Sequence, residues 1–248
     1  MAHWKFDGTL ADEVDSANDG TSPGTITYAG GMDGDAVKIA EPDEFVLIDN
    51  AMGLFNEVSI SMWFYPPGAA LGYASVLMVP QEGAPTGSIS ITTAYTGLNV
   101  EVPGSGVDDT VGSLASNAWS HLVFVYKPEA KEAVIYINGE PIATVTVTNQ
   151  DVLPNLTTLG IGARNPLDIT NMFDQGLFDD IRIYNFGLSS LNVASLYTEF
   201  MTGESICLEP PDFDVNGDCI FDIEDFAEIA ATWLECNLVR DCIAPEMP

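Results

Sequence analysis

Val58-Ser59-Ile60-Ser61-Met62-Trp63-Phe64-Tyr65 is the stretch that decides the fold. Successive side chains of a β-strand point to opposite faces, so the alternation places every second residue from Val58 to Phe64 on one apolar face. The runs from Trp119 to Tyr126 and from Ala133 to Asn138 alternate in the same way. These three segments predict strands that each bury one face.

Turn signals separate these runs and similar ones. Asn138-Gly139 predicts a tight hairpin between 131–138 and 140–148, because both central residues of a type I′ turn need a positive φ. Further strands are predicted at 36–40, 45–49, 87–93, 97–102, 157–163 and 177–184. Many short strands with Gly, Pro, Asn and Asp between them predict an all-β, two-sheet jelly-roll sandwich.

Composition shifts near residue 202 and divides the chain. A helix capped by Ser189 or Ser190 closes the first domain, predicted over residues 1–201. Residues 202–211 contain Pro210-Pro211 and are predicted to form a stiff linker. Residues 212–248 then form a second, smaller module.

Charge narrows the classes of partner. The chain has 248 residues, of which 46% are hydrophobic, so it can bury a core and is not disordered by composition. It carries 37 acidic against seven basic residues, a net charge of −30, which disfavours nucleic acid and anionic lipid surfaces. The sequence contains no run of about 20 consecutive apolar residues, so no membrane-spanning segment is predicted. The simplest interpretation is a soluble exported protein of a salty or calcium-rich medium.

The cysteines bear on the compartment. All four lie in the small module or its linker: Cys207, Cys219, Cys236 and Cys242. No Cys-x-x-Cys pair is present and both histidines are distant, so disulfides are favoured over a metal site, and secretion over a cytosolic location. The chain opens without a hydrophobic leader, which predicts either a cytosolic protein or a signal peptide missing from this sequence.

Several motifs occur together in a recognisable order. They are Trp4–Gly8, Gly31–Ala36, Ser59–Phe64, Trp119–Phe124, Tyr136–Gly139 and Gly176–Asn185. Because of these motifs and their order, residues 3–201 resemble the laminin-G-like, concanavalin A-type jelly rolls of bacterial exported proteins. The resemblance implies one calcium ion at the rim, held by Asp15 and Asp179 with Asn18 or Asp19 behind them. The alternative is that this Asx-rich loop only turns the chain.

Catalysis is not expected. Sandwich relatives that cleave polysaccharides carry two spaced carboxylates on one strand, whereas Glu41-Pro42-Asp43-Glu44 has the wrong spacing and a proline. No nucleophile elbow or phosphate loop is present. His121, alone in an apolar strand, is expected to be structural.

Sugar-binding proteins present exposed aromatic side chains to their ligands. Trp4 and the loop residues Tyr73 and Tyr95 are the candidate ligand-binding residues, whereas Trp63 and Trp119 are expected to pack in the core.

The segment from Asp214 to Asp225 has the spacing of an EF-hand calcium loop. Oxygen ligands fall at positions 1, 3, 5, 7, 9 and 12, which are Asp214, Asn216, Asp218, the carbonyl of Ile220, Asp222 and Asp225. Position 6 normally holds Gly for a sharp turn; here it is Cys219, so either a disulfide holds that turn or the site is weak. An acidic surface loop is the alternative.

The loop and the helix after it resemble one type I dockerin repeat with added cysteines. The helix carries an apolar stripe: Phe226, Ile229, Ala230, Trp233 and Leu234. A cohesin-binding dockerin has two such repeats and only one is found here, which puts a cohesin partner in doubt. The stripe then packs on the large domain (the preferred option), the tail or another chain. Four cysteines allow three pairings, of which Cys207–Cys219 with Cys236–Cys242 is favoured.

Two functions follow from these features. The first is a non-catalytic, calcium-stabilised extracellular protein for binding or adhesion, with glycans as the expected ligands. The alternative is a self-assembling structural subunit of a surface layer or filament, with another copy of the chain as partner. A polysaccharide hydrolase or lyase is the least favoured.

Overall fold

The computed structural model describes residues 1–41, 43–49, 56–66, 74–79, 89–94, 97–102, 108–148, 158–162 and 175–232. Its contacts divide the chain into two units, Met1–Glu204 and Ser205–Pro248. The boundary falls inside the segment that composition assigns to a linker.

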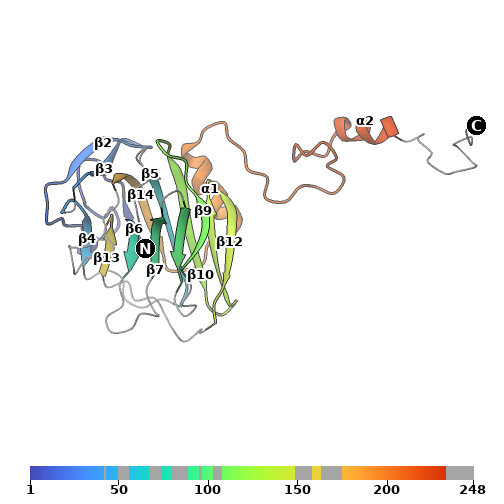
Figure 1. The fold of residues 1–248 in the computed structure, drawn as a ribbon. Coiled ribbons are helices and arrows are strands. Elements are labelled where there is room, and N and C mark those ends of the chain that lie inside the picture. The colour runs from blue at the N-terminus through green and yellow to red at the C-terminus, as the bar shows by residue number, and fades with distance from the viewer. Residues whose placement is uncertain are drawn as a thin grey trace, which may run out of the picture. The chain divides into compact units, whose positions relative to one another are not determined.

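The larger unit is a sandwich of two antiparallel sheets (Figure 1). The eight-stranded sheet contains β1 (Ala2–Trp4), β2 (Thr27–Gly30), β3 (Asp35–Ile39), β5 (Val58–Tyr65), β10 (Ser120–Lys127), β11 (Glu132–Ile137), β12 (Glu140–Thr146) and β14 (Gly176–Tyr184). Its order is β12-β11-β10-β5-β14-β3-β2, and β1 pairs with β14.

The six-stranded sheet contains β4 (Val46–Asp49), β6 (Ala74–Val79), β7 (Ile89–Ala94), β8 (Gly97–Glu101), β9 (Asp108–Ser113) and β13 (Thr158–Ile161). Its order is β4-β13-β6-β7-β8-β9. The predicted jelly-roll-like sandwich is therefore confirmed, and the expected strands are all present within one or two residues of their predicted ends.

The sequence analysis gives no range for four of these strands, which are β1, β2, β6 and β9. Half of the residues in Asp108-Asp109-Thr110-Val111-Gly112-Ser113 are Asp or Gly, which are depleted in strands, yet the segment forms β9. It lies at the edge of its sheet, where β8 supplies its ladder. Backbone pairing here outweighs local propensity.

The core lies between the sheets. Alternate residues of β5 and β14 point inward, and the rings of Phe64 and Phe178 lie 4.7 Å apart. The predicted hairpin is also present, because Asn138 (φ 52°) and Gly139 (φ 83°) both adopt the left-handed conformation between β11 and β12.

Helix α1 (Ser190–Phe200) covers part of the larger sheet's outer face, the face turned away from the other sheet. Ser189 caps it, with its side chain accepting from the Asn192 N–H and the Asn192 side chain accepting from the Ser189 N–H. Val193 of the helix packs with Val123 and Tyr136 of the sheet.

The smaller unit consists, where described, of a loop and helix α2 (Ile223–Thr232). The helix begins two residues before the predicted start at Asp225, because the Asp222 carboxylate accepts the Glu224 N–H and caps the first turn. In the part of the chain that the structure describes, no helix is long and apolar enough to cross a membrane.

Candidate functional site

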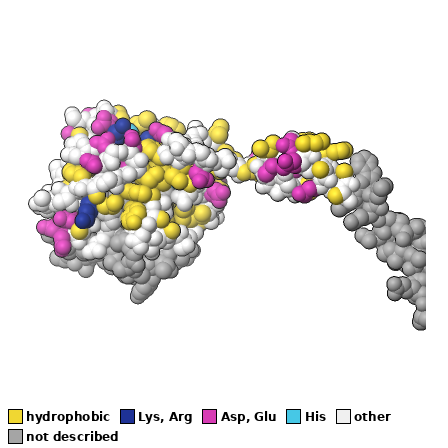
Figure 2. Space-filling view, turned by 90° about the horizontal axis from the view of Figure 1, so that it is seen from above, with side chains coloured by type: hydrophobic (Ala, Val, Ile, Leu, Met, Phe, Trp, Pro, Cys, Tyr) yellow, Lys and Arg dark blue, Asp and Glu magenta, His cyan; other side chains and the backbone are white. Residues whose placement is uncertain are grey.

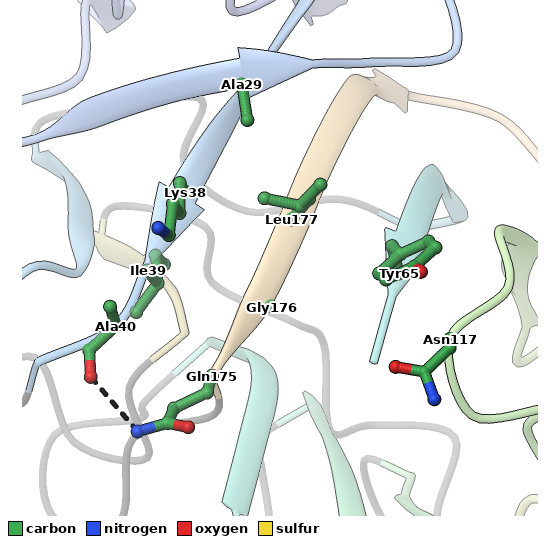
Figure 3. Close-up of a pocket in the computed structure, with 9 residues that line it drawn as sticks. All are labelled: Ala29, Lys38, Ile39, Ala40, Tyr65, Asn117, Gln175, Gly176 and Leu177. Atoms are coloured by element: carbon green, nitrogen blue, oxygen red, sulfur yellow. Dashed lines mark hydrogen bonds between the residues drawn. The ribbon is translucent and has the colours of Figure 1, made fainter. Parts of the chain in front are cut away.

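A groove of about 390 Å³ opens on the outer face of the larger sheet (Figure 3). The residues that line it are Ala29, Lys38, Ile39, Ala40, Tyr65, Asn117, Gln175, Gly176 and Leu177. They come from β2, β3, β5, β14 and the adjoining loops. The groove therefore exists only because strands that are distant in the sequence lie side by side.

Strand register builds the floor of the groove. Leu177 on β14 pairs with Lys38 on β3 at one side and with Tyr65 on β5 at the other. The neighbouring residue Phe178 points inward to the core, so these three side chains point outward by alternation. Lys38 and Tyr65 thus form opposite walls, with Leu177 between them (Figure 3).

One wall is aromatic and held in place. The Tyr65 ring packs edge to face against the half-buried Trp119, with the ring centroids 5.6 Å apart. Nearby, Asn117 adopts a left-handed conformation, φ 56°, and its N–H donates to the Pro66 carbonyl at 2.9 Å. The end of β5 and the turn before β10 therefore position a ring and an amide together.

The floor near Gly176 brings two strands close together. The Gln175 amide donates to the Ala40 carbonyl at 3.0 Å, and its oxygen points away from Ala40 (Figure 3). A side chain at Gly176 would collide with the Phe64 ring and the Tyr65 carbonyl. Glycine is required here by the close approach of β5.

Trp4, predicted to contact sugar, does not lie on the surface. It is fully buried, and its indole N–H donates to the Asn18 carbonyl at 3.0 Å. That prediction is wrong, because a ring inside the core cannot stack on a ligand. The other two predicted platforms, Tyr73 and Tyr95, lie outside the described residues.

The sequence analysis missed Tyr65, Lys38 and Gln175. Tyr65 continues the alternation of β5 on the face opposite the apolar one, which was a usable signal for an outward ring. Trp119, expected in the core, is only half-buried and supports Tyr65. Nothing in the local sequence marks Lys38 or Gln175.

His121 is buried, as its place in an apolar strand predicts. Its Nε2 lies 2.8 Å from the Ser61 hydroxyl, and its ring packs on Trp63 with the centroids 5.0 Å apart. Burial lowers the pKa of His121 to about 3, against a smaller opposing effect of Asp180. The imidazole is neutral at physiological pH and serves packing.

The residues expected to bind calcium in the sandwich fall into separate groups. Both Asp179 oxygens accept backbone N–H groups, from Met32 (2.7 Å) and Asp33 (3.2 Å) on one oxygen and from Asp180 (2.7 Å) on the other. Burial nevertheless raises the pKa of Asp179 to about 6. This carboxylate is joined to the 31–34 loop and not to the 15–20 loop.

Of the other members of that set, two are hydrogen-bonded to Asp12 and one is not. Asp15 is exposed and caps the short 3-10 helix η1 (Ser16–Asn18). The Asn18 amide donates to the Asp12 carboxylate, and the Asp19 carboxylate accepts the Asp12 backbone N–H. Within the described ranges, no group of three or more His, Cys, Asp or Glu side chains is arranged to hold a metal ion.

The small unit folds its loop around two carboxylates. Asp214 accepts the N–H groups of Gly217 (2.7 Å) and Cys219 (2.9 Å). Asp225 is buried and accepts from Val215 (2.8 Å), Asn216 (3.3 Å) and Asp222 (2.8 Å). These backbone hydrogen bonds lower the pKa of Asp225.

Cys219 occupies the position that EF-hand loops give to glycine. It adopts φ 67°, in the left-handed region, and forms a disulfide with Cys207, the pairing that the sequence favours. Cys236 and Cys242 lie outside the described residues, as do Trp233 and Leu234 of the apolar stripe. Phe226 of that stripe is 52% exposed, and Ile229 is half-buried.

Comparisons with known proteins agree with the sandwich. The model of a family described as the concanavalin A-like lectin/glucanases superfamily (Laminin_G_3) matches residues 33–194. A search of curated proteins finds no match.

Solved structures are similar in fold at low sequence identity. One is domain 4 of AbnA, a GH43 extracellular arabinanase from Geobacillus stearothermophilus, in complex with arabinotriose: TM-score 0.61, 21% identity, 79% of this chain and 97% of that one. Another is the ligand-binding domain of botulinum neurotoxin serotype D in complex with N-acetylneuraminic acid: TM-score 0.63, 12% identity, 80% and 50% covered. A third is the binding domain of botulinum neurotoxin serotype G, with a TM-score of 0.63 and 12% identity, over 82% of this chain and 51% of that one.

Proposed function

The chain belongs to the concanavalin A-like lectin/glucanases superfamily, and on that premise we propose that it is a non-catalytic, calcium-stabilised, extracellular glycan-binding protein. The groove across β3, β14 and β5 is its binding site. Adhesion to a glycan-bearing surface is the corresponding role of the whole chain.

The observation that carries the proposal is the arrangement around Tyr65. Binding sites combine an apolar or aromatic surface with a few placed polar groups. Here the Tyr65 ring is held by Trp119, the Leu177 side chain lies beside it, and the amides of Asn117 and Gln175 lie at the same end (Figure 3). Such a groove offers stacking for a sugar ring and hydrogen bonds for its hydroxyls.

The similar structures support this proposal at the level of chemistry. Arabinotriose and N-acetylneuraminic acid are bound by two of them, and both ligands are carbohydrates. The chain spans about half the length of the neurotoxin domains, so their other properties are not carried over.

A non-catalytic role is supported by the lining of the groove. Glycoside hydrolysis generally needs two carboxyl groups that flank the scissile bond. Among the described residues, none of those that line the groove is Asp or Glu.

Calcium is proposed for the loop of the small unit. Its ligands would be Asp214, Asn216, Asp218, the Ile220 carbonyl, Asp222 and Asp225, an all-oxygen set that suits a hard cation. The left-handed Cys219 supplies the sharp turn at position 6, so the backbone fits the EF-hand pattern there. Bound calcium would order the loop and take no part in chemistry. The sandwich site at Asp15 and Asp179 stays a second, separate proposal.

An extracellular location is supported by the disulfide Cys207–Cys219, because disulfides persist in oxidising compartments.

The test is binding to a glycan array in millimolar calcium by the full chain and by Tyr65→Ala. Loss of the stacking ring should weaken binding at least tenfold, since truncating a buried anchor residue costs about 2 kcal/mol or more. Phe186→Ala is the matched control, since Phe186 is 46% exposed and does not line the groove. Failure of the folded protein to bind any glycan, or equal binding by Tyr65→Ala, would contradict the proposal.

A structural subunit is the second candidate, favoured by apolar side chains on the small unit (Figure 2). Those that are at least half exposed are Phe213, Val215, Ile220, Phe221, Ile223 and Phe226. Light scattering after size exclusion, in calcium and in chelator, separates the candidates. Oligomers that Phe221→Ser disrupts would support assembly, whereas a monomer in both buffers would exclude it.

A further inference from the structure

The groove has one cationic side chain and no anionic one among its described lining residues. Lys38 lies on the wall opposite Tyr65. We propose that the groove selects glycans whose sugar ring carries a carboxylate, with Lys38 binding the carboxylate and Tyr65 stacking on the ring. This inference rests on the proposed function and names the ligand class of the same site.

The charge of the groove runs against the charge of the chain. Acidic residues outnumber basic ones 37 to seven, and at their share of the chain a lining of this size would contain on average about one carboxylate. The described lining contains none, and its one formal charge is positive. A neutral sugar needs no such exclusion, whereas a carboxylated sugar would be repelled by an Asp or Glu in contact with it.

Lys38 is exposed and available for a ligand. Among the described residues, the ion pairs join Lys5 to Asp33, Arg182 to Asp180 and Glu199, and His3 to Asp180. No ion pair to a described residue involves Lys38. Its strand neighbours in register are Leu177 and Thr27, neither of which is charged.

The distances suit one bound sugar. Lys38 and Tyr65 are separated by one intervening strand, so their backbones lie about 10 Å apart, twice the spacing of neighbouring strands. The lysine ammonium sits on a flexible four-carbon stem. It can reach a carboxylate that projects from a ring stacked against Tyr65.

Net charge restricts the size of the ligand. The chain has a net charge of −30, and its electric field repels a long polyanion. At physiological ionic strength, salt screens interactions between charges that lie more than roughly 8 Å apart. A contact with Lys38 is shorter than this, so a single carboxylate is bound locally. Short or singly charged acidic glycans are therefore favoured over long polyuronides.

The test compares matched acidic and neutral probes by calorimetry. The acidic probes are 3′-sialyllactose and trigalacturonate, which distinguish a sialic from a uronic acid; the neutral trisaccharides 3′-galactosyllactose and galactotriose are their counterparts. We expect the full chain to bind at least one acidic probe about tenfold more tightly than its counterpart, as for one charge-assisted hydrogen bond. Lys38→Gln should abolish this preference, and Lys38→Arg should keep it.

Lys131→Gln is the matched control, because Lys131 is exposed in the β10–β11 turn outside the groove. A preference that survives Lys38→Gln, or equal binding of acidic and neutral probes, would overturn the inference and leave the proposed glycan site intact. Tyr65→Ala should weaken both classes of probe. Binding of neither class by the folded chain, or no effect of Tyr65→Ala, would instead contradict the proposed function itself.

Discussion

At the scale of single residues, exposure separates rings that bind from rings that stabilise. Tyr65 and Trp63 are two residues apart on the outer face of β5, yet Trp63 is 1% exposed beneath α1 whereas Tyr65 lines the groove. Trp63 stacks on Tyr197 of the helix with the centroids 5.7 Å apart. The same residue class on the same strand face therefore serves packing at one position and recognition at the other.

His121 makes the fold sensitive to acid. Its folded-state pKa of about 3 lies below the value of about 6.5 of an unfolded histidine, so the unfolded chain binds the proton first. Its contribution to stability is present above pH 6.5 and is lost as the pH falls toward 3, by up to about 1.4 kcal/mol per pH unit. Urea unfolding of His121→Gln should show a shallower loss between pH 6.5 and 4.5.

The comparison with His121→Gln is needed because other groups titrate in this range. Asp179, whose folded-state pKa is raised to about 6, acts in the opposite direction and gains stability as it is protonated. Asp180 and Arg182 face His121, and the charge of Asp180 partly offsets the lowering. Equal pH slopes for the two proteins would refute the assignment.

At the scale of elements, the 214–225 loop depends on one backbone conformation. Cys219 has φ 67°, which costs a residue with a Cβ atom about 1–2 kcal/mol and costs glycine nothing comparable. The disulfide to Cys207 ties this residue in place. Conformation and crosslink can be separated by substitution.

Two double variants separate the effects. Both carry Cys207→Ser, and they differ in having Cys219→Gly or Cys219→Ala. Both lack the disulfide, but only glycine adopts the left-handed turn freely. Calcium titration by calorimetry should therefore give weak binding, roughly micromolar to millimolar, that the glycine variant retains and the alanine variant loses several-fold. Asp214→Ala serves as the non-binding control. Equal affinities of the glycine and alanine variants would show that the turn is unimportant.

At the scale of the whole molecule, net charge opposes compactness. At −30, self-repulsion destabilises the folded chain, and salt relieves it by shortening the Debye length from about 30 Å at 0.01 M to about 8 Å at 0.15 M. The thermal midpoint should rise over this range of NaCl at pH 7. Near pH 4.1, the pI of the sequence, the increase should vanish. An equal increase at both pH values would point to a cause other than charge.

The sequence by itself determined the features that depend on neighbours along the chain. Alternation in 58–65 predicted β5, Asn138-Gly139 predicted the hairpin of β11 and β12, and a cap at Ser189 or Ser190 predicted the start of α1. Each depends on local periodicity or on the φ of one or two residues, which residue identity largely decides.

Only the tertiary structure decided which side chains meet. Trp4 is buried because β1 pairs with β14, and the groove forms because β14 pairs with β3 on one side and with β5 on the other. No local pattern encodes the register between such distant strands, since long-range pairing is set by the fit of the whole core. The fold could therefore be predicted from the chain, whereas Lys38, Tyr65 and Gln175 become one site only when the sheet places them side by side.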